Sequence, residues 1–284
     1  MSYVLENDVL TLECIEKGGE MQHLLLKSSG REVLYQGDQG WSGKNPSLFP
    51  MVGNTFSKDY VIDGKTYAMK NHGLIRYATL KGNSSQDELV FELDANEDTL
   101  KQYPFDFHYE IHYKLDGNRV CISYKIQNKG NEDMPFGFGL HPGFKLDDAF
   151  SEYSLEFEKE EHAKQLLFDP SFEKKIEYQD VVLKEWKLSR EDIKKYATII
   201  YKDLSSSYVT LKYHGKPIVR VSIHNFPFLA LWSHETPSDF LCIEPWYSHA
   251  DFEKDAGDFY HREGTVVLKP SEEWSCSYWI EVEG

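Results

Sequence analysis

Alternation of apolar and polar residues is the dominant pattern along this chain, and it predicts β-strands. The clearest case lies between residues 107 and 126, where two alternating runs flank a turn at residues 116–118. The apolar positions of the two runs share one face, in the order Phe107, Tyr109, Ile111, Tyr113 and Leu115, then Val120, Ile122, Tyr124 and Ile126. We therefore expect an antiparallel pair of strands with one buried face.

Similar runs separated by turn residues predict the other strands. An Asp63-Gly64 dipeptide between residues 60–62 and 65–67 is a strong hairpin signal. Further strands are expected at residues 4–6, 9–14, 21–27, 32–35, 208–213, 218–224, 228–233, 241–246, 264–268 and 275–282. Residues 36–58 are rich in Gly, Pro, Asn and Ser, so they predict a long irregular connection of the kind that is often functional.

Helical patterns are sparse in this sequence. Ser189-Arg190-Glu191-Asp192 has the composition of a capped helix start, and it predicts one short helix that ends near Tyr196. The sequence contains no long linker and no convincing repeat. We therefore expect one all-β domain over residues 1–284, a large antiparallel β-sandwich with few short helices.

Composition and charge narrow the classes of partner. The formal net charge is −16, which argues against nucleic acid and anionic membranes as partners. No apolar run approaches the roughly 20 residues of a spanning helix, and the first residues lack a signal-peptide pattern, so we expect a soluble, cytoplasmic protein. The four cysteines are far apart in the sequence and predict free, buried thiols, with no metal or cofactor.

Glu244 is the first candidate for chemistry. It lies inside the apolar run Leu241-Cys242-Ile243-Glu244-Pro245-Trp246-Tyr247. A carboxylate in such surroundings needs either a partner or a function, because burial disfavours its charge. The proline predicts the end of the strand and places Glu244 at the rim of a sheet. Trp246 offers the flat apolar face that sugar pockets use.

Two further segments contain histidines that suit proton transfer near neutral pH. His141 lies in a glycine-rich stretch, Gly139-Leu140-His141-Pro142-Gly143, where glycines indicate close backbone approach. His72 and Arg76 lie in Asn71-His72-Gly73-Leu74-Ile75-Arg76, which suits binding of polyol or phosphate oxygens. The structural alternatives are a core histidine bonded to a carbonyl and a solvated loop with an incidental arginine.

Taken together, these segments resemble the aldose 1-epimerase (galactose mutarotase) family, and within it the bacterial LacX-like branch. The matching segments follow the family's order: Tyr35-Gln36-Gly37-Asp38 with Trp41, then 46–53, 71–76, 139–144, and 242–247 followed by Asp251. The resemblance covers nearly the whole chain. It implies a supersandwich of β-strands and cofactor-free interconversion of the α and β anomers of an aldose, a small-molecule sugar.

The resemblance also implies roles for individual residues. Glu244 would be the general base on the anomeric hydroxyl, and His141 would be the general acid on the ring oxygen. His72 would assist near the ring oxygen, and Arg76 would hold substrate oxygens. Trp246, Asn54 and Asp251 would contribute to substrate binding.

One position departs from the family pattern. Where relatives usually carry an arginine after the Val-Gly of the first signature, this chain has Asn54. This leaves open whether the sugar is neutral or a hexose 6-phosphate, whose phosphate Arg76 would bind either alone or with help from Lys58 or Lys70. A non-catalytic sugar-binding protein on the same fold is the second hypothesis. A glycoside hydrolase is the third, because Asp251 is a nearby second carboxylate.

Overall fold

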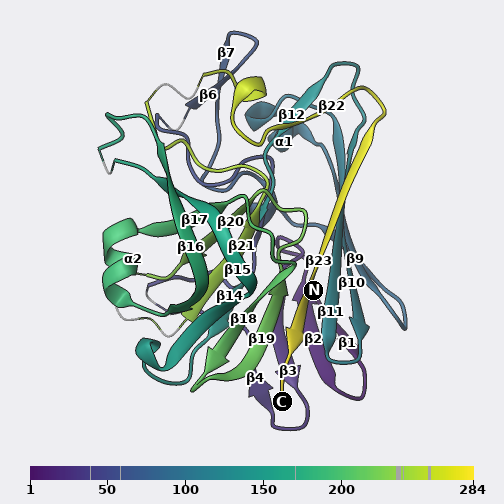
Figure 1. Cartoon of the computed structure of the whole chain (residues 1–284). Helices are drawn as coiled ribbons and strands as arrows, with labels where there is room; N and C mark the ends of the chain where they lie inside the picture. Colours follow the sequence, from purple (N-terminus) through teal and green to yellow (C-terminus); the bar gives the residue numbers. More distant parts are fainter. Residues whose placement is uncertain (39, 58, 170, 235–237, 239, 255–256) are drawn as a thin grey trace.

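Antiparallel strands build almost the entire molecule (Figure 1). The computed structural model describes every residue except 39, 58, 170, 235–237, 239, 255 and 256. The main sheet runs in the order β5 (Ser47–Leu48), β13 (Gly139–Leu140), β21 (Phe240–Trp246), β20 (Phe228–Trp232), β17 (Thr198–Lys202), β15 (Tyr153–Leu167), β18 (Tyr208–Tyr213), β19 (Lys216–Ser222), β23 (Glu273–Val282), β11 (Arg119–Asn128), β10 (Phe107–Asp116), β9 (Leu89–Asp94) and β8 (Lys81–Ser84). Two further strands join it, since β14 (Gly143–Lys145) pairs with β21 and β16 (Glu177–Lys187) pairs with β15.

Smaller sheets and short helices complete the fold. The N-terminal sheet consists of β1 (Ser2–Glu6), β2 (Leu10–Ile15), β3 (Met21–Leu26) and β4 (Arg31–Glu32). The other pairs are β6 (Asp59–Ile62) with β7 (Lys65–Ala68), and β12 (Met134–Phe136) with β22 (Val266–Leu268). The two α-helices of the described chain are α1 (Glu97–Gln102) and α2 (Arg190–Tyr196).

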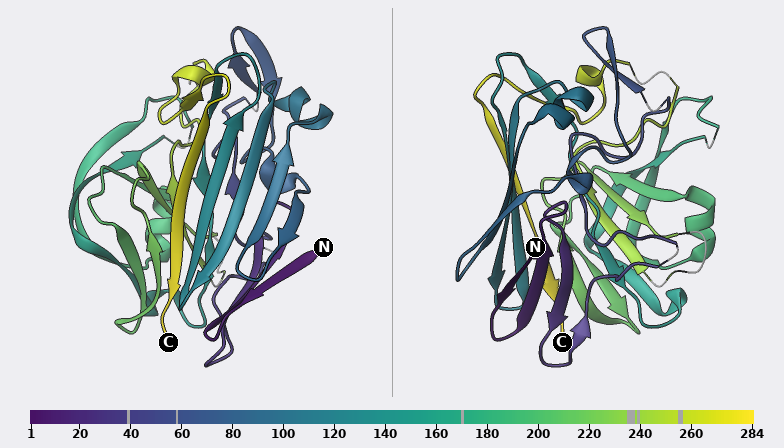
Figure 2. Two further views of the ribbon diagram at one scale, coloured as in Figure 1. Left: turned by 90° about the vertical axis from the view of Figure 1, so that its right-hand side faces the viewer. Right: turned by 180° about the vertical axis from the view of Figure 1, so that it is seen from behind.

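The core is one large apolar cluster to which strands along most of the main sheet and the N-terminal sheet contribute. The 107–126 pair is confirmed as β10 and β11, with Tyr113 opposite Ile122 and both buried. Figure 2 shows the strands β9, β10, β11 and β23 side by side, with the N-terminal strands next to them. The inward-facing residues of both sheets, including Leu12, Leu24 and Phe91, form one apolar cluster.

The predicted helix is confirmed, whereas a second helix and several strands, among them β8, β9, β15, β16 and β17, were not predicted. Ser189 caps α2 by accepting a hydrogen bond from the backbone N–H of Asp192. The sequence analysis missed α1, although Asn96 and Thr99 form a capping box at its start. It also missed the long hairpin of β15 and β16, because β16 is largely exposed and its apolar residues do not alternate strictly with polar ones.

The predicted strand at residues 241–246 is confirmed as β21, but the prediction that its proline places Glu244 at the rim of a sheet is wrong. Strand β21 continues to Trp246, and it lies between β20 on one side and β13 and β14 on the other. Glu244 is therefore in the middle of the main sheet, opposite Ala230 of β20, and not at a rim. Pro245 is tolerated there in a strand whose residues are all buried.

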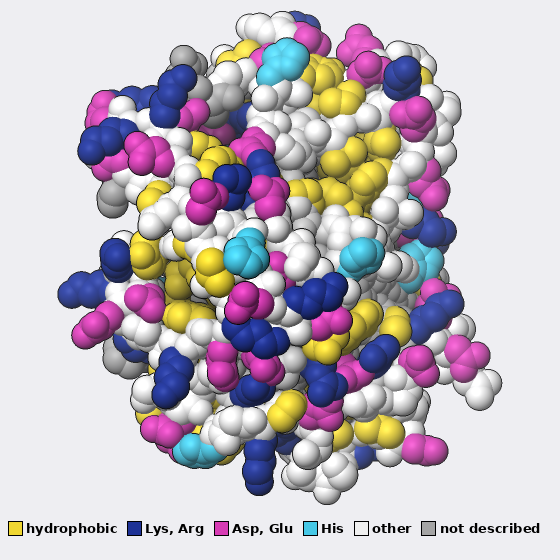
Figure 3. Space-filling model, viewed as in Figure 1, with side chains coloured by type: hydrophobic (Ala, Val, Ile, Leu, Met, Phe, Trp, Pro, Cys, Tyr) yellow, Lys and Arg dark blue, Asp and Glu magenta, His cyan; other side chains and the backbone are white. Residues whose placement is uncertain are grey.

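The surface is mixed in charge. Figure 3 shows acidic and basic side chains interspersed over the face that it draws. This distribution fits a solvated surface better than a binding site for a polyanion. None of the described helices is long and apolar enough to cross a membrane.

Candidate active site

The register of the main sheet places His141 beside Glu244. Strands β13 and β14 lie on either side of His141, and both pair with β21. Gly139 is opposite Trp246 and Gly143 is opposite Cys242. In an antiparallel pair each step forward on one strand is a step back on the other, so residue 141 falls opposite residue 244. The two candidate groups are thus cross-strand neighbours, whose side chains lie on the same face.

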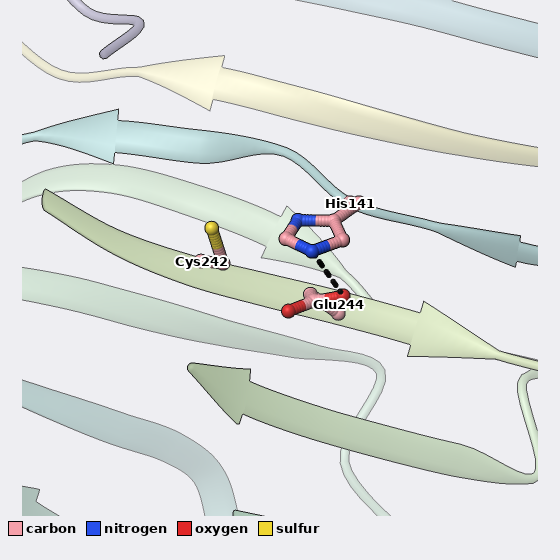
Figure 4. Close-up of side chains that lie close together, drawn as sticks. All are labelled: His141, Cys242 and Glu244. Carbon is pink, nitrogen blue, oxygen red and sulfur yellow. Dashed lines mark ion pairs between the residues drawn. The ribbon is translucent and has the colours of Figure 1, made fainter. Parts of the chain in front are cut away.

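The His141 and Glu244 side chains make direct contact in a buried position. The Nε2 atom of His141 lies 3.4 Å from Oε2 of Glu244, and these side chains are 6% and 1% exposed. Figure 4 shows the imidazole pointing at the carboxyl group, with the thiol of Cys242 on the same face of β21. Among the described groups Oε2 of Glu244 has no hydrogen-bond partner. A buried carboxyl oxygen in that state is available to a ligand.

Aromatic rings hold the His141 imidazole in place. Trp41 stacks on it with ring centroids 4.8 Å apart and an angle of 24° between the planes. Trp232 approaches its edge at 5.6 Å. Trp41 can come this close because residue 143 is glycine, where a Cβ atom would lie 2.5 Å from the indole. The imidazole is therefore confined to one orientation, as a proton-transfer group requires.

Burial shifts the proton affinities of the pair toward each other. It raises the pKa of Glu244 well above its usual value, and the Trp246 indole and the positive charge of Arg76 only oppose this in part. Burial, together with the nearby His72 and Arg76, lowers the pKa of His141 well below 6.5. The carboxylate becomes a stronger base and the imidazolium a stronger acid. Because the two groups are in contact, they titrate as a unit and not independently.

His72 is oriented by the irregular connection that the sequence predicts at residues 36–58. The backbone N–H of Gly53 donates to Nδ1 of His72 at 3.0 Å. The backbone N–H of His72 in turn donates to the carbonyl of Gly53 at 2.8 Å. Since Nδ1 accepts, the neutral ring carries its proton on Nε2 and is a donor toward the cavity. Burial and the charge of Arg76 lower the pKa of His72 to about 3, so it stays neutral.

Exchanging His72 for Asn is expected to change how stability depends on pH. Folded His72 resists protonation down to a pKa of about 3, whereas the unfolded residue takes a proton near 6.5, so acidification between these values costs stability. Asn tolerates the backbone angle φ of +65° at this position and keeps an oxygen for the Gly53 N–H. Urea unfolding between pH 7 and pH 4 should show that the unfolding free energy falls less steeply with acidification in the variant than in the wild-type protein. The two slopes should differ by at most about 1.4 kcal/mol per pH unit. Parallel curves of unfolding free energy against pH for the two proteins would contradict the lowered pKa of His72.

A cavity of about 520 Å³ opens above the pair. All seven residues that the sequence analysis proposed for the site line it, namely Asn54, His72, Arg76, His141, Glu244, Trp246 and Asp251. Within the described lining Arg76 is the sole lysine or arginine, and no described carboxylate pairs with it. Its guanidinium lies 5.3 Å from the ring of Tyr77. The cavity thus presents one available cation beside the His141–Glu244 pair.

Asp251 has a structural partner that the sequence analysis did not identify. Arg262 donates to its Oδ2 at 3.0 Å, and the backbone N–H of Phe56 is 3.3 Å from the same oxygen. Burial raises the pKa of Asp251, and Arg262 opposes the shift. The backbone of Asp251 also donates to the carbonyl of Asn54 at 3.0 Å. These contacts fix the Asn54 loop, and they occupy one oxygen of the carboxylate that a hydrolase would need.

Several lining residues escaped the sequence analysis. Trp232 and the phenylalanines Phe172 and Phe252 add apolar surface to the cavity. Phe252 stacks on Phe168 with ring centroids 4.4 Å apart. The excess of aromatic residues in the composition was the available signal, but it does not say which rings face the cavity. Their positions depend on loops and on strand order, which local patterns do not encode.

Comparisons with known proteins agree with this architecture. A model of the aldose 1-epimerase family matches residues 1–280. The chain is 29% identical over 268 residues to protein LacX, chromosomal form, of Lactococcus lactis subsp. lactis, and the match covers 87% of each protein. The resemblance identified in the sequence, including its LacX-like branch, is therefore confirmed.

Solved structures with the same fold support the predicted architecture. A galactose mutarotase related enzyme from Lactobacillus acidophilus superposes with a TM-score of 0.92 at 27% identity, covering 100% of this chain and 98% of that one. A galactose mutarotase-like protein from Lactobacillus casei gives a TM-score of 0.94 at 24% identity and full coverage of both chains. The expected galactose mutarotase-like sandwich is thus confirmed.

Proposed function

Because this chain belongs to the aldose 1-epimerase family, we propose that it interconverts the α and β anomers of an aldose by acid/base opening and closure of the sugar ring. The observation that carries the proposal is the buried contact of 3.4 Å between His141 and Glu244 at the base of the cavity. A purely sugar-binding protein has no need to keep an acid and a base in one buried pair, since burying both groups is costly.

The reaction uses the one proton that the pair shares. In the proposed step Glu244 takes the proton from the anomeric O1–H, while the imidazolium of His141 gives its proton to the ring oxygen O5. The C1–O5 bond breaks with its electrons on O5, and C1 and O1 form a carbonyl. Rotation about C1–C2 exposes the other face, and the same transfers in reverse close the ring. The pair holds one proton at every stage, so no external acid or base is required.

The other lining residues would position the sugar. His72 donates from Nε2 and so suits the ring oxygen or a hydroxyl, while Arg76 suits substrate oxygens. Trp246 offers an apolar face to one side of a pyranose. A phosphate dianion would meet a single guanidinium and two acidic residues among the described lining groups. This charge balance favours a neutral aldose over a hexose 6-phosphate.

A polarimetric assay on a panel of neutral aldoses and hexose 6-phosphates tests the proposal. We expect faster mutarotation of at least one neutral aldose and a weaker effect on every phosphorylated sugar. The pH profile of kcat/KM should be bell-shaped, because activity requires a single proton on the pair and is lost when the pair holds two or none. Acceleration of phosphorylated sugars alone would reverse the substrate assignment. Calorimetric binding of sugars without any acceleration would support the non-catalytic alternative.

A further inference from the structure

Cys242 adds a third ligand-type side chain to the His141–Glu244 pair. Ligand atoms of Cys242, His141 and Glu244 all lie within 4.8 Å of one another, and all three residues are buried (Figure 4). Cys242 and Glu244 are two residues apart on β21, so both point to the same face. Acid/base chemistry on a sugar has no use for this thiol, which is absent from the cavity lining.

We propose that these three side chains form a binding site for a zinc-class divalent cation, which blocks the cavity's proton-transfer pair when it is bound. Thiolate, imidazole and carboxylate together are a donor set that Zn²⁺ prefers. Two ligand atoms about 2.1 Å from a tetrahedral Zn²⁺ are about 3.4 Å apart. This equals the separation of 3.4 Å between Nε2 of His141 and Oε2 of Glu244.

Charge and proton balance also suit such an ion. A thiolate and a carboxylate neutralise the two positive charges, so the buried complex carries no net charge. Binding displaces the proton of the thiol and the proton that His141 and Glu244 share, so two protons leave for each ion bound. Oε2 of Glu244, which is buried without a hydrogen-bond partner in the described chain, would be satisfied by coordination to the ion.

A second cluster must be removed before the binding is measured. Glu92, His108 and Glu110 also lie within 4.8 Å of one another, but on the partly exposed outer side of β9 and β10. The His108→Asn protein is therefore the background for the experiment. Co²⁺ is the spectroscopic probe, because a thiolate ligand gives it a near-ultraviolet charge-transfer band. Equilibrium dialysis with Zn²⁺ gives the stoichiometry.

In this background we expect one bound ion per chain and a thiolate–Co²⁺ band. Cys242→Ala should abolish the band and weaken Zn²⁺ binding by more than the roughly 10–100-fold that loss of an outer-sphere partner costs. His141→Asn should weaken binding as well. Cys14→Ala is the matched control, since Cys14 is equally buried but lies in β2, and it should leave the band unchanged. A band that survives Cys242→Ala, or the absence of Co²⁺ and Zn²⁺ binding, would overturn the proposal.

Metal binding can be tested whether or not the protein has the proposed activity. Only the proposed inhibition by the bound ion rests on that activity. Where mutarotation is observed, Zn²⁺ should inhibit it, with inhibition measured against each protein's own metal-free rate. Cys242→Ala should need a correspondingly higher Zn²⁺ concentration for half-inhibition. If mutarotation is absent but the Co²⁺ band behaves as expected, the proposed function fails and the metal site stands. If Zn²⁺ binds through Cys242 without inhibition, the proposed block is wrong.

Discussion

Replacing Glu244 by Gln is expected to lower kcat/KM for mutarotation roughly 10²–10⁴-fold, the usual contribution of a positioned acid or base. Gln keeps the volume of the side chain at a position that is 1% exposed, but it cannot take the proton from O1. A coupled or polarimetric assay with an accepted aldose measures the loss. The circular dichroism spectrum and the unfolding midpoint should stay close to those of the wild-type protein.

Two controls separate this effect from general damage. Glu160→Gln changes an exposed residue of β15, which β20 and β17 separate from β21, and it should leave the rate unchanged. His141→Asn should cost about as much as Glu244→Gln, and the double variant little more, because groups that act as a unit are not additive. Full activity of Glu244→Gln would exclude Glu244 as the base.

Replacing Gly73 by Ala is expected to destabilise the fold by roughly 2–5 kcal/mol, from backbone strain plus overpacking. Gly73 has φ of +80°, and a Cβ atom there would lie 2.2 Å from the carbonyl oxygen of Phe49. That oxygen accepts a hydrogen bond of 2.7 Å from the N–H of Leu74, so the loop cannot simply move away. Urea denaturation measures the loss of unfolding free energy, and the displaced His72 should also reduce activity.

Gly64→Ala is the matched comparison for Gly73→Ala. Gly64 has φ of +72° in the turn between β6 and β7, but no atom lies within 4 Å of its would-be Cβ. It therefore reports backbone strain alone, and we expect a loss of roughly 1–2 kcal/mol. Equal losses for the two variants would show that the contact with Phe49 contributes nothing.

The sequence predicted several of the strands in which one face alone is buried, although β9 was missed despite its alternating burial. The pair β10 and β11 could be recognised because its alternation is strict, and the Asp63-Gly64 turn identified β6 and β7. Strand β21 is buried throughout, so its residues do not alternate, and the proline gave a false signal only for the position of Glu244 within the sheet. The hairpin of β15 and β16 was missed for the opposite reason, because β16 is mostly exposed.

The candidate site was predicted as a set of residue types, without its geometry. Glu244, His141, His72 and Arg76 were identified from unusual contexts and from the family resemblance. What no local pattern could give is the register that sets His141 opposite Glu244, which needs β13 and β14 to pair with the same strand. Arg262 was missed because its role depends on contact with Asp251, 11 residues away in the sequence but adjacent in the fold.

The most direct test of the central claim is exchange spectroscopy by NMR on a neutral aldose at anomeric equilibrium. The signals of the α and β anomers report their interconversion without any net reaction. With the wild-type protein we predict an exchange rate that rises in proportion to protein concentration, and with Glu244→Gln a rate close to the spontaneous one. An exchange rate that stays spontaneous with wild-type protein, for every aldose that it binds, would contradict the account.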